Sequence, residues 1–317
     1  MINRSMVRTH VVQTLFAHYQ SEGNTTLHAR KELLKSFSCT YNLYLLLLDF
    51  VNELTNYAEE QLNERIKRAK ATHRTYEPNR RFVENRFAKQ IFENKMLRRL
   101  VEENHLSWEV GLSGVKAVYR QLESSEAYRA YMEKTEVRYE DDNAIWRKIF
   151  TDMLVENEDF VNALDEMEIA MDAQGWTVDL DVIATYVLKT VKKFKEDSDA
   201  DQPLLEMFDK QEEMDFALRL LQYAIEGRDE YQGYIASHLK DWDEQRIPMM
   251  DKIILQVALA EILRMEDIAI EVSLNEYIEI AKWYSGDKSY VFINGILTRI
   301  MLDKHAEGAL PKAGKVK

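Results

Sequence analysis

Apolar residues recur at helical spacing over most of this chain. In residues 4–20 they fall on one face, which comprises Val12, Leu15, Phe16 and Tyr19. A second clear stripe comprises Met250, Ile253, Ile254, Val257 and Leu263. There is no sustained alternation of apolar and polar residues, and no hairpin dipeptide stands between β-branched runs. The pattern therefore predicts an all-α protein.

The same pattern predicts where several helices lie. They are expected over residues 4–20, 28–37, 39–72, 80–104, 178–195, 204–227 and 229–240, and three further helices close the chain. The most apolar run, residues 43–51, contains Asp49 and is too short to span a bilayer, so it predicts a core helix. The turn-rich residues 196–203 predict a linker.

The three closing helices have recognisable end signals. Pro248 suits the first turn of one helix, where a missing N–H costs nothing. Ser273 and Glu276 have the spacing of a capping box at the start of the next. Gly286 is placed to end that helix in the left-handed conformation. Asp287 or Ser289 can then cap the last helix.

An Asn-Gly pair, Asn294 and Gly295, interrupts the last helix. Glycine inside a helix costs about 1 kcal/mol relative to alanine. The pair therefore indicates close packing or contact with a ligand.

Length and composition set the broad class. The chain has 317 residues, enough for two domains. Its single cysteine, Cys39, excludes an internal disulfide and fits a reducing cytoplasm. No secretory signal pattern is found at the N-terminus. We expect a cytoplasmic protein with no membrane-spanning segment.

Charge is unevenly distributed. The net charge of −13 argues against indiscriminate nucleic-acid binding. Residues 65–99 nevertheless hold 12 Lys and Arg against 3 Glu, whereas residues 140–181 hold 13 acids against Arg147 and Lys148. Residues 304–317 form a basic tail that includes Lys312, Lys315 and Lys317. Net charge is therefore a poor guide to any local surface.

Catalytic machinery is not evident in the sequence. It contains no HExxH, CxxC, GxSxG or Walker-type motif, and its seven histidines are scattered. Asp179 and Asp181 are interpreted as helix-capping acids rather than metal ligands. The sequence therefore predicts neither an enzyme nor a metal or cofactor site.

Four motifs, in the right order, resemble the NusB family of bacterial transcription antitermination factors. They are RTHVVQTLFAHYQ at 8–20, MDK with ALAEIL between 250 and 263, EVSLNEYIEIAK at 271–282 and FINGIL at 292–297. The resemblance covers residues 1–20 and 205–303. It implies a NusB-like core of two small helical bundles, into which residues 21–201 are inserted as an additional helical region.

The resemblance also implies a function without catalysis. NusB proteins bind boxA-type single-stranded RNA together with NusE, a small-subunit ribosomal protein, and support transcription elongation on ribosomal RNA operons. Carried over by position, the RNA-binding residues are Arg4, Arg8, Tyr290, Phe292 and Asn294. The NusE-binding residues are Phe16 and Asp251. Within that fold Gly295 would let a neighbouring helix approach closely, and Asn294 would either satisfy polar groups at helix ends or contact RNA.

The chain departs from the family pattern in its arginines. Only Arg4 and Arg8 stand where family members have a denser cluster. One hypothesis is that the basic stretch compensates, with Arg80, Arg81 and Arg86 as accessory RNA-binding residues. The rival hypothesis is that this stretch pairs internally with the acidic residues 140–181.

Two other classes of function stay open. A helical protein-interaction scaffold of NusB fold, with little or no RNA binding, fits the acidic charge and the few arginines. An RNA-modifying enzyme is a further alternative, because NusB-like domains also occur fused to RNA methyltransferases. No glycine-rich cofactor loop supports the enzyme.

Overall fold

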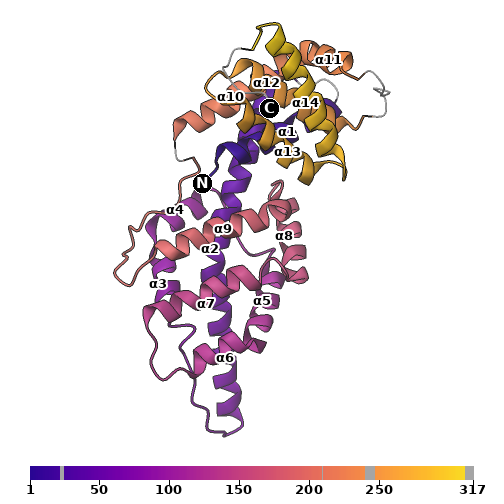
Figure 1. Ribbon diagram of the computed structural model, residues 1–317. Coiled ribbons are helices and arrows are strands. Elements are labelled where there is room, and N and C mark those ends of the chain that lie inside the picture. The colour runs from indigo at the N-terminus through magenta and orange to yellow at the C-terminus, as the bar shows by residue number, and fades with distance from the viewer. Residues whose placement is uncertain (22–24, 209, 240–246, 311–317) are drawn as a thin grey trace. The chain divides into compact units, whose positions relative to one another are not determined.

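A computed structural model describes residues 1–21, 25–208, 210–239 and 247–310. Within these ranges it is built of helices, and the only β feature is an isolated bridge between Ile2 and Phe208. The prediction of an all-α protein is confirmed (Figure 1). The helices are α1 Arg4–Gln20, α2 Thr26–Ala71, α3 Arg86–Glu93, α4 Lys95–Glu103, α5 Leu112–Ser124, α6 Glu126–Glu133, α7 Tyr139–Asp152, α8 Glu158–Ala170, α9 Trp176–Lys193, α10 Gln211–Glu226, α11 Arg228–Ser237, α12 Met249–Arg264, α13 Ile270–Tyr284 and α14 Ser289–Ala306.

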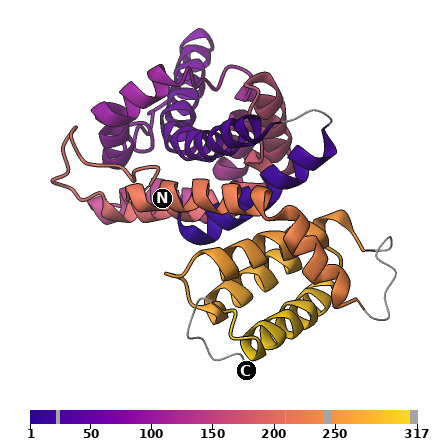
Figure 2. The ribbon, with the colours of Figure 1, turned by 90° about the horizontal axis from the view of Figure 1, so that it is seen from above.

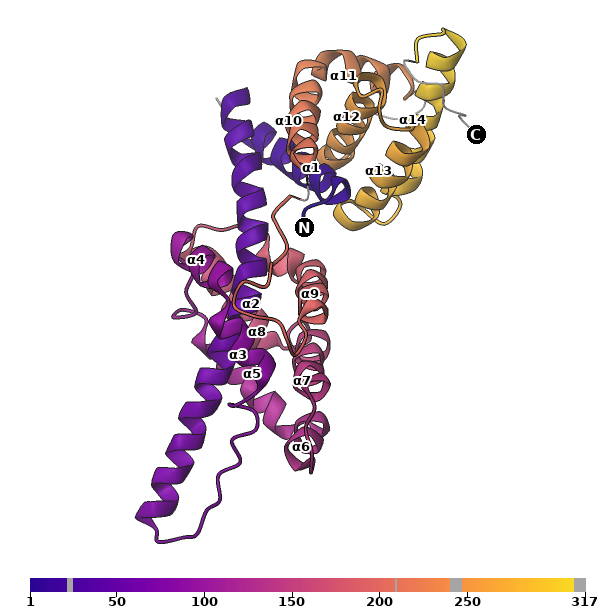
Figure 3. The ribbon, with the colours of Figure 1, turned by 90° about the vertical axis from the view of Figure 1, so that its left-hand side faces the viewer.

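The chain divides into two compact units. The middle unit comprises residues 38–207 with Met1, and the terminal unit comprises residues 2–37 and 208–317. Helix α2 contributes to both, because it runs without a break for 46 residues (Figure 3). The sequence predicted two helices here, separated near Ser38. No glycine or proline stands at that point, so nothing interrupts the hydrogen-bonded ladder.

In the terminal unit α12 is the central helix. Every residue of α12 from 253 to 262 is buried. A helix that is apolar on all sides needs neighbours on all sides, and α1, α10, α11, α13 and α14 all contact it. Figure 2 shows these C-terminal helices, coloured orange to yellow, grouped together.

In the middle unit α2 forms the core. Residues 43–51 are buried except for the partly exposed Asp49, which confirms the predicted core helix. Indole N–H groups from two later segments reach carbonyl oxygens of α2. Trp108 donates to Leu46 at 3.2 Å, and Trp176 donates to Cys39 at 2.8 Å. These bonds tie the segment before α5 and the first residue of α9 to the central helix.

Several predicted helix ends differ in the structure. Helix α13 begins at Ile270, so Ser273 lies inside the helix rather than at its N-cap, and its side chain is fully buried. The glycines with positive φ in the described ranges are Gly175 and Gly308, so Gly286 is not in the left-handed conformation. Lys288 precedes α14 and makes no side-chain cap hydrogen bond. Ser273 is instead used for a tertiary contact described below.

The basic helix predicted over residues 80–104 is two helices, α3 and α4. Asn94 separates them, and its side-chain oxygen accepts from the Leu97 N–H at 2.9 Å, which starts α4. Its Nδ2 donates to the Gln202 carbonyl at 2.8 Å. The predicted linker at 196–203 therefore lies against α4, and the Lys95 N–H also donates to Ala200 there.

Two further expectations concern the membrane and the tail. Among the described helices none is long and apolar enough to cross a bilayer. Helix α14 takes up the start of the predicted tail, ending at Ala306. The tail residues Lys312, Lys315 and Lys317 lie outside the described residues.

Candidate nucleic-acid interface

Arg8, a predicted RNA-binding residue, forms a buried ion pair. Its Nε and Nη2 donate to the two carboxylate oxygens of Glu261, each at 2.8 Å. The side chains of Arg8 and Glu261 are 3% and 0% exposed. The Ser273 and Tyr277 hydroxyls donate to the same carboxylate at 2.6 and 2.9 Å. One arginine, one acid and two hydroxyls thus join α1, α12 and α13.

Within this network Arg8 stays charged and Tyr277 stays neutral at ordinary pH. Burial lowers the pKa of Arg8, but hydrogen bonding to Glu261 and the charge of that carboxylate outweigh it, and the net pKa is raised. Burial, with the Glu261 charge, raises the pKa of Tyr277 well above its usual value, so the phenol remains a donor. Arg8 is therefore buried within the terminal unit and paired with Glu261. This position does not agree with the prediction that Arg8 contacts RNA.

Sequence reasoning missed Glu261, Ser273 and Tyr277 as a polar cluster. The available signal was an acid within an apolar helix. A serine and a tyrosine four residues apart, on one face of the next helix, completed that signal.

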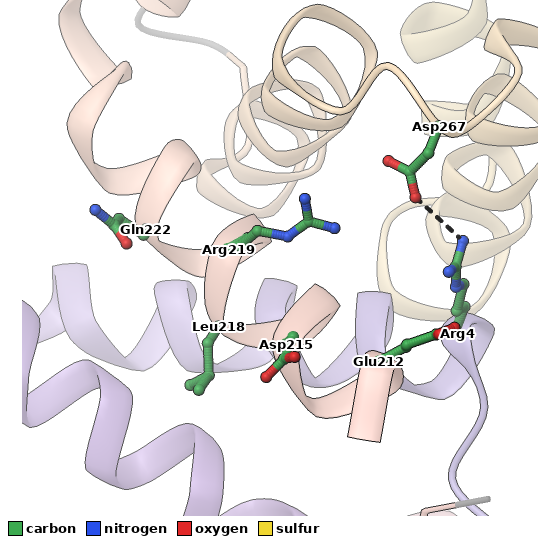
Figure 4. A pocket seen from close by; sticks show the side chains of 7 residues that line it. All are labelled: Arg4, Glu212, Asp215, Leu218, Arg219, Gln222 and Asp267. Carbon is green, nitrogen blue, oxygen red and sulfur yellow. Dashed lines mark ion pairs between the residues drawn. The ribbon is translucent and has the colours of Figure 1, made fainter. Parts of the chain in front are cut away.

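Arg4 lines a surface pocket of about 600 Å³, shown in Figure 4. Its Nη1 lies 3.8 Å from Asp267 Oδ2, and its guanidinium carbon lies 5.1 Å from the centre of the Phe216 ring. The pocket also contains Arg219 together with two further acids, Glu212 and Asp215. Three carboxylates against two guanidiniums make this pocket a poor phosphate site by itself.

A second candidate surface lies where α13 ends and α14 begins. Trp283, in the last turn of α13, is 82% exposed. The ammonium of the neighbouring Lys282 lies 5.7 Å from the centre of the Tyr290 ring on α14, within cation–π range. Lys288 is exposed. We call these four residues the α13–α14 corner; it combines aromatic rings with two lysines, of which Lys282 is paired with Glu279 at 2.5 Å.

The remaining predicted RNA residues of α14 flank this corner. Phe292 is half-buried and Asn294 is exposed. A Cβ added to Gly295 would have no atom within 4 Å. The expectation that Gly295 allows close packing of a neighbouring helix is therefore wrong. The exposed Asn294 does not bridge buried helix ends either, so the Asn-Gly pair faces open space.

The structure does not bring all predicted RNA residues together. Arg4 pairs with Asp267, just before α13 begins, whereas Tyr290 lies against Lys282 in the last turn of α13. A helix of 15 residues is roughly 22 Å long at about 1.5 Å per residue. Arg4 and the α13–α14 corner therefore lie at opposite ends of α13, and RNA touching both must run along that helix.

The two predicted NusE-binding residues are also partly enclosed. Phe16 on α1 is half-buried. Asp251 is only 2% exposed, and its carboxylate accepts a hydrogen bond from Ser285 Oγ. Asp251 therefore holds the start of α12 to the end of α13 rather than offering a free carboxylate to a partner.

The three arginines predicted as an accessory RNA site bind acceptors in the middle unit. Arg80 pairs with Glu59 and Glu84 at 2.8 Å. Arg86 Nε lies 2.5 Å from the buried carboxylate of Asp142. Arg81 Nη1 donates to the carbonyls of Tyr131 and Met132, each at 2.7 Å. The Arg86–Asp142 pair agrees with internal pairing between the basic and acidic segments, and all three guanidiniums already have acceptors within the middle unit.

No group of three or more His, Cys, Asp or Glu residues suited to a metal ion occurs in the described part of the chain. Among the surfaces described above, the α13–α14 corner, with Asn294 beside it, is the strongest candidate interface.

Comparison with known proteins identifies relatives of part of this chain. A NusB family model matches residues 181–302. The transcription antitermination protein NusB of Chloroherpeton thalassium is 38% identical over 101 residues, which are 32% of this chain and 48% of that protein. The NusB of Salinibacter ruber is 34% identical over 135 residues, covering 41% of this chain and 84% of that protein. The NusB of Clostridium botulinum is 34% identical over 114 residues, covering 36% and 81%. No solved structure matches the chain significantly.

Proposed function

The chain belongs to the NusB family, and we propose that it is a non-enzymatic transcription antitermination factor. In this proposal it binds boxA-type single-stranded RNA together with NusE, within the elongation complex on ribosomal RNA operons. The relatives that support this proposal are named as transcription antitermination proteins.

The observation that carries RNA binding is the exposure of Trp283 next to lysines. A large aromatic side chain that is 82% exposed has no packing role, and a base can stack on either face of the indole. The ammonium group of Lys288 suits an adjoining phosphate, and Lys282, which pairs with Glu279 at 2.5 Å, lies beside it.

Within this proposal the other predicted residues have unequal roles. Tyr290, Phe292 and Asn294 complete the RNA surface at the corner, and Asn294 can hydrogen-bond to a base edge. Arg4 serves as a second, weaker contact at the other end of α13. Phe16 supplies apolar area to the NusE surface, and Asp251 acts by positioning the end of α13.

A titration of the full chain with fluorescently labelled boxA-like RNA tests the proposal, using a scrambled RNA of equal length as the control. We expect tighter binding of the boxA-like RNA, stronger still when NusE is added, and weakening with rising salt. Equal and weak binding of both RNAs, with and without NusE, would overturn it.

A protein-interaction scaffold with little RNA binding is the second candidate. Burial of Arg8 against Glu261 favours it, because this removes one of the two N-terminal cations that the family comparison pointed to. In that case the chain would retain NusE in a pull-down and the same titration would show no RNA binding.

A further inference from the structure

The C-terminal end of α2 projects from the rest of the middle unit. Figures 1 and 3 show its last turns extending beyond the neighbouring helices before the chain returns toward α3. Every residue in the range 70–79 is exposed. A helix end that is polar on all sides gains little from packing, so its charges either pair with one another or meet a partner.

The charge at this end is positive. Residues 65–74 contain five Lys and Arg residues and neither Asp nor Glu. Two of the five pair with nearby acids: Arg65 lies 2.5 Å from Glu123 and Lys67 lies 2.8 Å from Glu64. The side chains of the other three form no ion pair within the described ranges; we call these three the α2 basic end, and they are Arg68, Lys70 and Arg74.

Helix stability alone does not explain these cations. A basic residue in the last turn interacts favourably with the helix dipole. Here, however, basic residues also follow one another three positions apart, Arg65 before Arg68 and Lys67 before Lys70. Like charges at this spacing repel each other across one helical turn and destabilise the helix. A bound polyanion would remove that repulsion.

A fixed turn holds Arg74 at the helix end. His73 has a φ of 51°, in the left-handed region. The Arg74 N–H then donates to the Ala69 carbonyl at 3.0 Å, which folds the chain back against the last turn of α2. The three free cations are thus presented together on a short stretch of ordered backbone.

Tyr76 places an aromatic ring beside them. It is 40% exposed and lines a pocket of about 360 Å³ that also contains Arg65 and Arg129. Cα atoms two residues apart lie within about 7 Å, so a base stacked on Tyr76 leaves its phosphate within reach of the Arg74 side chain. Glu77 and Glu133 line the same pocket, which favours phosphates on the outer surface of α2 rather than inside the pocket.

We propose that the α2 basic end binds the phosphate backbone of single-stranded RNA, with Tyr76 stacking on one base. Exposed cations that follow a strand, together with an aromatic ring, are the features of binding without sequence preference. The site lies in the middle unit. It does not rest on the boxA binding proposed for the terminal unit.

The same surface suits other polyanions less well. The apolar residues of the range 65–74 are Ile66, Ala69 and Ala71, which is too little apolar area for a helix that lies in a membrane interface. A protein partner would need a buried apolar or aromatic anchor at its centre, and this end of the helix offers none besides Tyr76.

The test combines Arg68→Gln, Lys70→Gln and Arg74→Gln in the full chain and measures the affinity for a scrambled single-stranded RNA by anisotropy at several salt concentrations. We expect roughly tenfold or more weaker binding at low salt. The slope of log affinity against log salt should decrease by about 2, because each phosphate contact on a single strand contributes about 0.7. Gln, Lys and Arg have similar helix propensities, so the melting temperature should not fall.

A matched control combines Lys192→Gln, Lys193→Gln and Lys195→Gln. These lysines are also exposed at a helix end of the middle unit, and the variant has the same change in net charge. It should keep the wild-type affinity and salt slope. Tyr76→Leu should weaken binding about fivefold or more, as loss of base stacking implies, and leave the slope unchanged.

The outcomes decide the proposal. It fails if the triple variant of the α2 basic end keeps the wild-type affinity, if it loses no more than the α9 control, or if the wild type binds no scrambled RNA at low salt. Lost binding to anionic lipid vesicles with unchanged RNA affinity would identify a membrane surface instead. A sequence-independent contact weakens boxA-like and scrambled RNA by the same factor, so the ratio of their affinities continues to test the proposed function separately.

Discussion

Arg8 and Glu261 are 253 residues apart in the chain, yet their side chains form a two-pronged ion pair with both N–O distances at 2.8 Å. The pair fixes α1 against α12 in the centre of the terminal unit. The pair thereby joins α1 to a helix in the last third of the chain, although the sequence of the middle unit lies between the two helices.

Breaking this pair should destabilise the terminal unit. Arg8→Ala leaves the Glu261 carboxylate buried and uncompensated, which typically costs about 3–5 kcal/mol of unfolding free energy. Urea unfolding followed by circular dichroism measures the loss. Arg4→Ala is the control, because the long contact of Arg4 with Asp267 is exposed and such pairs contribute about 0–1 kcal/mol. Equal losses in the two variants would contradict the assignment.

Removing the exposed indole should weaken RNA binding without affecting the fold. Base stacking on an aromatic side chain contributes roughly 1–3 kcal/mol per base, so Trp283→Ala should lose about tenfold or more in RNA affinity. Anisotropy measures the affinity, and the melting temperature should stay near that of the wild type. Val272→Ala, at the other end of α13 and 47% exposed, serves as control. A wild-type affinity for Trp283→Ala would place the RNA elsewhere.

Stability of the middle unit should respond to the protonation of Asp179. Burial raises the pKa of this carboxyl to about 6, against a Thr40 hydrogen bond that lowers it, and the Glu168 charge adds to the rise. The folded state then holds the proton over a pH range in which the unfolded state has lost it. The free energy of unfolding should therefore fall as pH rises from about 4, the pKa of an unperturbed Asp, to about 6.

The Asp179→Asn variant tests this dependence. It should be more stable than the wild type above pH 6, and the advantage should shrink as pH falls toward 4. Melting temperatures measured across this range report the difference. Asp181→Asn, exposed on the same helix, controls for the change in net charge. An advantage that is constant with pH would contradict the explanation.

Gly295→Ala should stabilise α14. The added methyl meets no atom within 4 Å, and alanine is about 1 kcal/mol more favourable than glycine inside a helix. The matched control is Gly114→Ala in α5, where the new Cβ would lie 2.9 Å from the Ala163 Cβ and must displace it. The melting temperature should rise for Gly295→Ala and fall for Gly114→Ala. A destabilised Gly295→Ala would indicate a neighbour at that surface.

Arg86→Gln should destabilise the middle unit and leave RNA affinity unchanged. The Asp142 side chain is 5% exposed, so it would lose its main counter-charge where water cannot replace it. Urea unfolding and the RNA titration give the two readouts. Loss of RNA affinity in a variant of unchanged stability would revive the accessory RNA site.

The local sequence predicted much of the fold because helix formation depends on near neighbours. The apolar run at 43–51 and the stripe in residues 250–263 identified the central helices of both units. The ends of the helices were less predictable. Ser273 has the spacing of a capping box, but its hydroxyl bonds to Glu261 in the tertiary fold, which local spacing cannot reveal.

The candidate site, like the fold, could be predicted from the sequence only in part. Sequence motifs pointed to the start of α14, and Asn294 is exposed there. They could not show that Arg8 is buried, since an arginine on an amphipathic helix has the same sequence pattern whether it meets water or a carboxylate. The exposure of Trp283 was equally hidden, because a tryptophan at helical spacing is usually part of a core.

By itself, then, the sequence determined the helical class, the order of the elements and the family, since each follows from periodicity and motifs along the chain. Only the tertiary structure decided which charged groups are free. Pairing joins residues far apart in sequence, as Arg8 with Glu261 and Arg86 with Asp142. Lys288, beside Trp283, is among the cations that have no ion pair in the described part of the chain, whereas Lys282 is paired with Glu279.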